Sequence, residues 1–203
     1  MRGRFITLEG IDGAGKSTHL AALASRFQKQ GNEVICTREP GGTPLAEQLR
    51  GLFLNEPMDA MTEALLVFAA RRDHLREVIL PAIGKGCTVL CDRFTDATFA
   101  YQGFGRGFST DILTQLEHWV QDGFQPDLTL WFDLSPHTAS MRRAMARNAD
   151  RFEQQDFEFF ARVRSGYQTR AETAPGRFAR VDAEHDLPDV ARQIDRILEA
   201  RQW

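Results

Sequence analysis

The chain has 203 residues, of which 42% are hydrophobic and 26% are charged, and its formal net charge is −3. This length suits one well-buried domain, or one domain with a small insertion, and the composition is typical of a soluble globular protein. The net charge provides no basic field that would attract nucleic acid, and the longest apolar runs are too short to cross a membrane. With no signal-peptide core at its start, the chain is expected to be cytoplasmic, without nucleic-acid or membrane partners.

Five short apolar runs have the length and the β-branched character of strands, and helical patterns separate them. The expected strands are residues 4–9, 33–37, 88–92, 128–133 and 178–181. The expected helices follow the first strand and then cover about 44–54, 62–83, 96–101, 110–120, 137–145, 153–170 and the closing segment from 187. This alternation predicts an α/β domain with a parallel sheet.

Apolar spacing also predicts which side chains are buried. Phe157 is expected on the inward face of the penultimate helix, and Leu187 on that of the closing helix. The three cysteines, Cys36, Cys87 and Cys91, lie in or beside strand-like runs. Their odd number, without metal-binding spacing in the sequence, predicts buried reduced thiols rather than a disulfide or a zinc site.

The most informative stretch lies between the first strand and the first helix. It reads Gly10-Ile11-Asp12-Gly13-Ala14-Gly15-Lys16-Ser17-Thr18 and matches G-x-x-x-x-G-K-[ST], the phosphate-binding P-loop. Glycines let the backbone curl so that its N–H groups surround phosphate oxygens at a helix N-terminus. Lys16 provides a mobile charge for the outer phosphates, and the Ser17 hydroxyl can ligate Mg²⁺. The motif predicts a nucleoside triphosphate site, with a plain glycine turn as the weaker alternative.

Two further strands end on residues suited to phosphate chemistry. Arg38 follows the second strand, and Asp92 and Arg93 end the third. Because ligands of parallel sheets bind beyond the carboxyl ends of the strands, these residues and the P-loop are expected to meet in one crevice. Guanidinium groups hold phosphates through paired hydrogen bonds, although surface ion pairing is the alternative for both arginines.

A single P-loop in a chain of this size favours a small-molecule kinase. The Asn-Lys-x-Asp motif that a GTPase needs is absent from the sequence. Four further stretches form a combination that is far more specific than the P-loop alone: Thr37-Arg38-Glu39-Pro40-Gly41-Gly42-Thr43, Phe68-Ala69-Ala70-Arg71-Arg72, Asp92-Arg93-Phe94 and Ala100-Tyr101-Gln102-Gly103. In order and spacing, over nearly the whole chain, this set resembles the bacterial thymidylate kinases.

The resemblance implies a three-layer P-loop kinase fold with a five-stranded parallel sheet flanked by helices. It implies one domain over residues 1–203, with a short mobile lid at about 142–153, and a homodimer. The implied reaction is Mg²⁺-dependent transfer of the γ-phosphoryl group of ATP to dTMP, which gives dTDP and ADP for dTTP synthesis.

Residue roles at the phosphates follow from the same resemblance. Arg93 and Arg38 match the family's grip on the acceptor phosphate. Asp92 matches the magnesium-associated acid, which acts beside Ser17. Asp12 matches a carboxylate that meets the 3′-hydroxyl of the acceptor sugar.

Recognition of the base is assigned to the helix over 62–83. Phe68 would stack on thymine, and an arginine one turn later would donate to a base carbonyl. Arg71 fits this role better than Arg72, although both lie near the face of Phe68, at i+3 and i+4. Ordinary core packing is the alternative for Phe68.

A second helical stretch contributes three more matches. Thr98 and Gln102, four residues apart, match polar groups that meet the thymine edge from one helix face. Tyr101 matches an aromatic residue that crowds the sugar's 2′ position and disfavours ribonucleotides. A solvent-facing hydroxyl is the alternative for Thr98. Glu39 and Asp96 lie near the matched motifs and could take water or metal contacts.

The catalytic arginine is expected in the lid. Some thymidylate kinases have a basic residue at the P-loop position of Gly13. A second group, which is bacterial, lacks that residue and has its catalytic arginine in the lid instead, and this sequence resembles the second group. Arg147 is the best-matched candidate and Arg143 the second, with a solvated helix charge as the alternative for Arg143. Such an arginine would stabilise charge on the transferred group together with the P-loop lysine.

Two other functions compete with this prediction. One is a nucleoside-monophosphate kinase of the same architecture that accepts a different base. The other is a regulatory module that hydrolyses or senses ATP. The paired acceptor-side arginines argue against the second, because a sensor needs no second phosphate grip.

Overall fold

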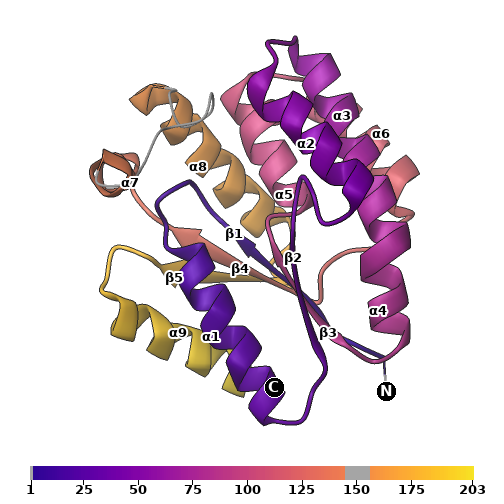
Figure 1. The fold of residues 1–203 in the computed structure, drawn as a ribbon. Helices are drawn as coiled ribbons and strands as arrows, with labels where there is room; N and C mark the ends of the chain where they lie inside the picture. The colour runs from indigo at the N-terminus through magenta and orange to yellow at the C-terminus, as the bar shows by residue number, and fades with distance from the viewer. Residues whose placement is uncertain (1, 145–155) are drawn as a thin grey trace.

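A five-stranded parallel sheet runs through the part of the chain that the computed structural model describes, residues 2–144 and 156–203 (Figure 1). The strands are β1 (Phe5–Glu9), β2 (Val34–Arg38), β3 (Thr88–Asp92), β4 (Leu128–Asp133) and β5 (Phe178–Asp182). Their order is β2-β3-β1-β4-β5, and every neighbouring pair is parallel. The predicted strands and the predicted α/β class are confirmed.

The helices of the described residues follow the predicted pattern, apart from two π-helical segments. They are α1 (Lys16–Lys29), α2 (Pro44–Asn55), α3 (Ala60–His74), α4 (Leu80–Gly84), α5 (Thr95–Thr98), α6 (Thr110–Gln121), α7 (Pro136–Ala144), α8 (Phe157–Thr173) and α9 (Leu187–Ala200), with π-helical segments η1 (Leu75–Ile79) and η2 (Phe99–Gly105). The predicted helix over 62–83 widens at η1 just before Pro81. Proline has no N–H to donate and crowds the preceding turn, which a wider turn relieves.

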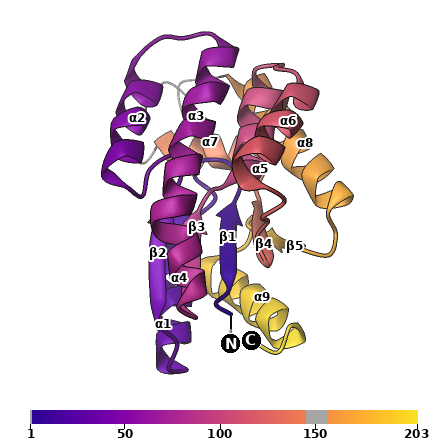
Figure 2. The same ribbon diagram turned by 90° about the vertical axis from the view of Figure 1, so that its right-hand side faces the viewer.

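Alternating side chains of the strands separate two helical layers. Ile6 and Leu8 of β1 share a buried cluster with Leu23 and Phe27 of α1. Phe5 lies on the opposite face, in a cluster with residues of η1 and α4. Figure 2 shows β1 pointing toward α2, α3 and α6, which stand beyond the carboxyl end of the sheet. The three-layer arrangement therefore leaves the ends of the strands facing a separate helical group.

Two predicted inward positions are wrong, and each is the first residue of its helix. Phe157 is 59% exposed and Leu187 is 54% exposed, whereas Phe159 is buried. Asp156 and Asp186 cap these helices by accepting backbone N–H groups at the third helical position. The caps fix the entry of the chain, and the residue directly after each cap faces solvent.

The cysteine prediction is only partly correct. Cys87 and Cys91 are buried and free, but Cys36 is exposed. Cys36 lies on β2, which is an edge strand of the sheet.

No helix in the described part of the chain is long and apolar enough to cross a membrane.

A buried carboxylate binds two arginines where the sheet meets α8. Asp96 is fully buried; its Oδ1 accepts from Arg170 Nε at 2.7 Å and its Oδ2 from Arg177 Nη1 at 2.6 Å. Burial alone would raise the pKa of Asp96, but the two guanidinium groups outweigh it and lower that pKa. Asp96 is therefore a buried structural anion, and the prediction that it takes water or metal contacts at the motifs does not fit this position.

A second carboxyl group, Glu9, lies at the end of β1 close to this anion. Its Oε1 accepts from the Phe94 N–H at 2.7 Å, and its Oε2 accepts from the Tyr167 hydroxyl at 2.9 Å. Burial, together with the negative charge of Asp96, raises the pKa of Glu9 to about 8. The fold thus favours a protonated Glu9 at neutral pH.

Close packing of α8 against η2 gives a first prediction. A Cβ atom at Gly166 would lie 2.9 Å from the Ala100 Cα, whereas one at Gly51 of α2 would meet no atom within 4 Å. Gly166→Ala should lower the free energy of unfolding by about 1–3 kcal/mol, because the helices must separate. Gly51→Ala should raise it by roughly 0.5–1 kcal/mol, because it adds helix propensity in open space. Urea denaturation of the wild type and of both variants measures these changes in unfolding free energy. Changes of the same sign and size in the two variants would contradict the close packing at Gly166.

The buried Glu9 gives a second prediction. The folded chain keeps a proton that the unfolded chain releases near pH 4.5, so Glu9 lowers stability as pH rises from about 4.5 to about 8. Glu9→Gln removes this loss. The unfolding free energy of the variant minus that of the wild type should rise through this range, by at most about 1.4 kcal/mol per pH unit, and level off above it. A difference that stays constant across denaturant titrations from pH 5 to 9 would refute the raised pKa.

Candidate active site

The P-loop connects β1 to α1 and curls around its own lysine. Lys16 is buried, and its Nζ donates to the carbonyl oxygens of Gly10 and Ile11 at 3.1 and 3.3 Å. Gly10 has a φ of 140°, and a Cβ there would lie 2.5 Å from the Phe132 carbonyl oxygen of β4. Only glycine permits this close approach of the loop to the neighbouring strand. Burial, followed by the charge of Arg93, lowers the pKa of Lys16.

A polar cavity, called here the P-loop cavity, opens above this loop. Its wall consists of Asp12, Gly13, Gly15, Lys16, Ser17, Thr18, Arg38, Glu39, Arg50, Asp92, Arg93 and Arg142. The structure therefore brings together the P-loop, Arg38 and the Asp92-Arg93 pair, as the positions of the three strand ends predict. The wall is rich in cations, which suits an anionic ligand.

Arg93 lies at the centre of the site in a left-handed backbone conformation, with φ 67°. Its Nη1 donates to the Gly10 carbonyl oxygen at 2.8 Å and to the Tyr167 hydroxyl at 3.0 Å. Its Nη2 donates to Asp12 Oδ1 at 2.7 Å and to the Tyr101 hydroxyl at 3.0 Å. Four groups from three segments thus fix one guanidinium plane.

Charge at the centre is strongly paired. Burial opposes ionisation of Asp12, but the charges of Arg93 and Lys16 outweigh burial and lower its pKa well below the ordinary range. Burial likewise opposes the charge of Arg93, and the nearby Asp12 raises the Arg93 pKa further above its usual value. The Tyr101 hydroxyl donates to Asp12 Oδ2 at 3.0 Å, and burial raises its pKa, so it acts as a neutral donor.

The Asp92 carboxylate has one oxygen that suits a cation. Asp92 Oδ1 is buried and has no hydrogen-bond partner among the described residues. Asp92 and Ser17 both line the P-loop cavity. A carboxylate and a hydroxyl are hard oxygen donors of the kind that Mg²⁺ takes together with phosphate oxygens and water. The residues present fit that ion, although the described residues contain no cluster of three or more His, Cys, Asp or Glu side chains with metal-binding spacing.

Arg38 reaches the same cavity from the end of β2. Its Nε and Nη2 donate to the two carboxylate oxygens of Glu47 at 3.1 and 2.8 Å. This paired hydrogen bond is the main cause that raises the pKa of Arg38 and lowers that of Glu47. More than half of the Arg38 side chain is exposed, so this ion pair contributes little stability and leaves Arg38 available to a ligand.

A second cavity adjoins the first and has a more apolar wall; it is called here the base cavity, because its wall includes Arg71, Thr98 and Gln102, which are expected from the sequence to meet a base. Its wall consists of Asp12, Glu39, Pro40, Arg50, Phe53, Leu54, Val67, Arg71, Arg93, Phe94, Ala97, Thr98, Tyr101 and Gln102. Four residues line both cavities: Asp12, Glu39, Arg50 and Arg93. The two cavities therefore share one wall, which includes the Arg93–Asp12 ion pair.

Arg71 is buried in the wall of the base cavity. Its Nε donates to Glu39 Oε2 at 2.7 Å, and its Nη2 donates to Thr98 Oγ1 at 2.9 Å. Glu39 is held from its other side by His74 Nδ1 at 3.0 Å. The remaining nitrogen, Arg71 Nη1, is buried without a hydrogen-bond partner in the described structure. A buried donor of this kind is costly unless a ligand supplies an acceptor.

Two predicted residues of the base-recognition helix lie outside this cavity. Arg72 is exposed, and its Nη1 donates to the Val120 carbonyl oxygen at 3.0 Å. Phe68 is 2% exposed and packs in a separate cluster with residues of α6 and η2. Val67, one position earlier, lines the base cavity instead. The core-packing alternative therefore fits Phe68 better than a stacking role.

Thr98, Tyr101 and Gln102 all line the base cavity, from the end of α5 and from η2. Thr98 accepts from Arg71, and the Gln102 Nε2 donates to Glu63 Oε2 at 3.1 Å. The π-helical turn closes with an Arg106 N–H to Tyr101 carbonyl bond of 2.9 Å. Such wide turns are frequent at functional sites, because they direct extra side chains toward one face.

Sequence reasoning assigned no role at the site to several wall residues, among them Arg50, Phe53 and Arg142. Arg50 of α2 lines both cavities, and its Nη1 donates to the Pro40 carbonyl oxygen at 2.8 Å. Phe53 lies one turn later on the same helix, and Arg142 of α7 reaches the P-loop cavity. The i, i+3 spacing of Arg50 and Phe53 predicts only a shared helix face, whereas Arg142 begins the segment predicted as the lid.

Neither lid candidate has a described side chain. Arg147 lies outside the described residues, and the side chain of Arg143 does as well.

Comparisons with known proteins agree with this geometry. The family described as thymidylate kinase matches residues 8–194. The thymidylate kinase of Paracidovorax citrulli is 59% identical over 98% of this chain and 94% of its own, and that of Burkholderia cenocepacia is 57% identical over 98% of each. The crystal structure of thymidylate kinase from Ehrlichia chaffeensis is similar with a TM-score of 0.81 and 35% identity, covering 98% of this chain and 99% of that one. These matches over nearly the whole chain, together with a P-loop cavity that shares Asp12, Glu39, Arg50 and Arg93 with a second cavity, show that the chain belongs to the thymidylate kinase family.

Proposed function

We propose that this chain transfers the γ-phosphoryl group of ATP to dTMP and releases dTDP and ADP. The observation that carries the proposal is the meeting of the two cavities at Arg93 and Asp12. A phosphate-binding loop alone fits any triphosphate site. A second cavity that opens onto the same arginine provides a place for an acceptor, so that donor and acceptor phosphates can approach in line.

On the donor side, the P-loop backbone and Lys16 hold the triphosphate. Ser17 and Asp92 would hold Mg²⁺, which would neutralise negative charge on the phosphates when bound. The Asp92 oxygen without a partner supports this role. Arg147, with Arg143 as the second candidate, remains the proposed source of additional positive charge at the transferred group.

On the acceptor side, Arg93, Arg38 and Arg50 provide guanidinium groups around one space. They bind the dTMP phosphate and hold it in position to attack, and Asp12 meets the 3′-hydroxyl of the sugar. The acceptor phosphate is already an anion near neutral pH, so positioning and charge neutralisation replace a general base.

The base cavity fits a thymine between an apolar wall and a polar edge. Phe53 and Val67 supply the wall, in place of the predicted Phe68. Arg71 Nη1 provides a donor for a base carbonyl, and Thr98 and Gln102 complete the edge. The buried Tyr101 ring remains the proposed barrier against a 2′-hydroxyl group.

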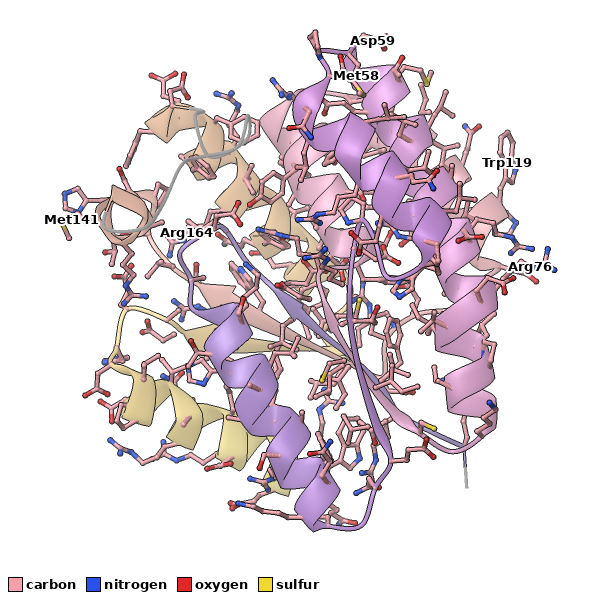
Figure 3. All side chains as sticks on the ribbon, viewed as in Figure 1. Met58, Asp59, Arg76, Trp119, Met141 and Arg164 are labelled. Carbon is pink, nitrogen blue, oxygen red and sulfur yellow. The ribbon has the colours of Figure 1, made fainter. Side chains whose placement is uncertain are left out.

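We also propose that the chain is a single kinase domain and forms a homodimer. We treat residues 1–203 as one kinase domain whose lid, at about 142–153, begins at the end of α7. A homodimer is supported by exposed apolar side chains on neighbouring helices: Leu65 of α3 is 50% exposed and Trp119 of α6 is 71% exposed. Trp119 points away from the body of the molecule in Figure 3.

The activity is tested by coupled measurement of ADP formation with ATP and a panel of acceptors: dTMP, dUMP, dCMP, dGMP and AMP. The chain should form ADP only when an acceptor is present and should clearly prefer dTMP. A different preferred acceptor would make it another nucleoside-monophosphate kinase. ATP hydrolysis that no acceptor changes would identify the ATP-sensing module instead.

The choice between the two neighbouring arginines gives a separate prediction. Arg71→Met should lower kcat/KM for dTMP about 10- to 100-fold, because it removes a charged hydrogen-bond donor from the cavity. Arg72→Met should change kcat/KM by no more than about twofold, because Arg72 lies outside the wall. Arg71→Lys serves as a second variant, since it keeps a positive charge beside Glu39 if the methionine variant folds poorly. A larger loss in Arg72→Met than in either Arg71 variant would reverse the assignment.

A further inference from the structure

We infer that Glu63 is a specificity-positioning residue, which holds the Gln102 amide so that its carbonyl oxygen serves the base cavity. This role rests on the proposed function and deepens it, because Glu63 would decide which end of the Gln102 amide, the NH₂ group or the oxygen, meets the base. Glu63 itself is absent from the wall of the base cavity, so it acts through Gln102.

The geometry leaves one chemically consistent orientation of the amide. Gln102 is 2% exposed, and its Nε2 donates to Glu63 Oε2 at 3.1 Å. Glu63 is 1% exposed, and its Oε1 lies 3.4 Å from Arg106 Nη2. Arg106 balances the charge of the buried carboxylate, which is a pure acceptor in that form. A carboxylate cannot accept from the oxygen end of an amide, so the NH₂ end must face Glu63.

The remaining end of the amide then determines what a base must offer. Gln102 lines the base cavity, and its oxygen is an acceptor. A base that presents an N–H to this oxygen gains a hydrogen bond, and a base that presents a ring nitrogen lone pair meets repulsion. Arg71 Nη1 offers a donor to the same cavity. One donor and one acceptor together match a pyrimidine with a carbonyl beside a ring N–H.

The chain contains a matched control for this arrangement. Glu117 accepts from a glutamine amide, Gln125 Nε2, at 3.0 Å and from an arginine, Arg170 Nη2, at 2.9 Å. The same three residue types therefore form a second partly buried cluster, and none of its members lines either cavity. Loss of the Glu117 carboxylate tests the general cost of removing such a charge without touching the base.

The experiment compares dTMP with 5-methyl-dCMP, which keeps the methyl group, sugar and phosphate and changes only the donor and acceptor pattern at ring positions 3 and 4. Glu63→Gln lets the Gln102 amide turn over, because a glutamine at position 63 can accept a hydrogen bond from its NH₂ group or donate one to its oxygen. The ratio of kcat/KM for dTMP to that for 5-methyl-dCMP should fall about tenfold, the equivalent of one hydrogen bond. Glu117→Gln should leave this ratio unchanged.

A second variant guards against a folding defect. The exchange variant, Glu63→Gln with Gln102→Glu, keeps an acid–amide pair and presents an acceptor-only group to the cavity. It should recover most of the preference for dTMP. An unchanged ratio in Glu63→Gln with dTMP turnover intact, or an exchange variant that shows no preference, would overturn the inference. A wild-type chain that does not phosphorylate dTMP would instead overturn the proposed function.

Discussion

The hydrogen bonds of Arg93 are the constraint on which the site depends. Arg93 directly follows β3 and has a left-handed backbone conformation. Its one guanidinium group binds Gly10, Asp12, Tyr101 and Tyr167. The P-loop, η2 and α8 are thereby tied to one point beyond the sheet. Hydrogen bonds to charged groups contribute roughly 1.5–3 kcal/mol each when well formed, so their combined effect is large for a marginally stable fold. The same point is where the two cavities meet.

Charge behind this point is divided between two carboxyl groups with opposite behaviour. Asp96 has two arginine partners and stays ionised, whereas Glu9 has neutral donors and is held in its protonated form. A second buried anion beside Asp96 would repel it, and the raised pKa of Glu9 avoids that cost. The neutral Glu9 accepts from Tyr167, which in turn accepts from Arg93. The position of the central guanidinium is therefore set by a chain of hydrogen bonds that reaches into the core.

The sheet and the phosphate side could be predicted from the sequence because both follow from local chemistry. Parallel strands end at one edge, so a P-loop after β1 and an arginine after β3 must lie close together. The base cavity could not be predicted in the same way. Val67 and Phe68 are adjacent on one helix, and only the packing of α3 against its neighbours decides which of them faces the ligand. Arg50 belongs to no motif and becomes visible only when α2 folds over the strand ends.

The central claim is that donor and acceptor bind at once in two cavities joined at Arg93. The most direct measurement is a calorimetric titration with adenosine and thymidine linked through a polyphosphate chain, followed by displacement with each natural ligand. The account predicts one site per chain, binding tighter than that of ATP or dTMP alone, and competition by both. Displacement by ATP alone, with no effect of dTMP, would show that the base cavity does not hold the acceptor.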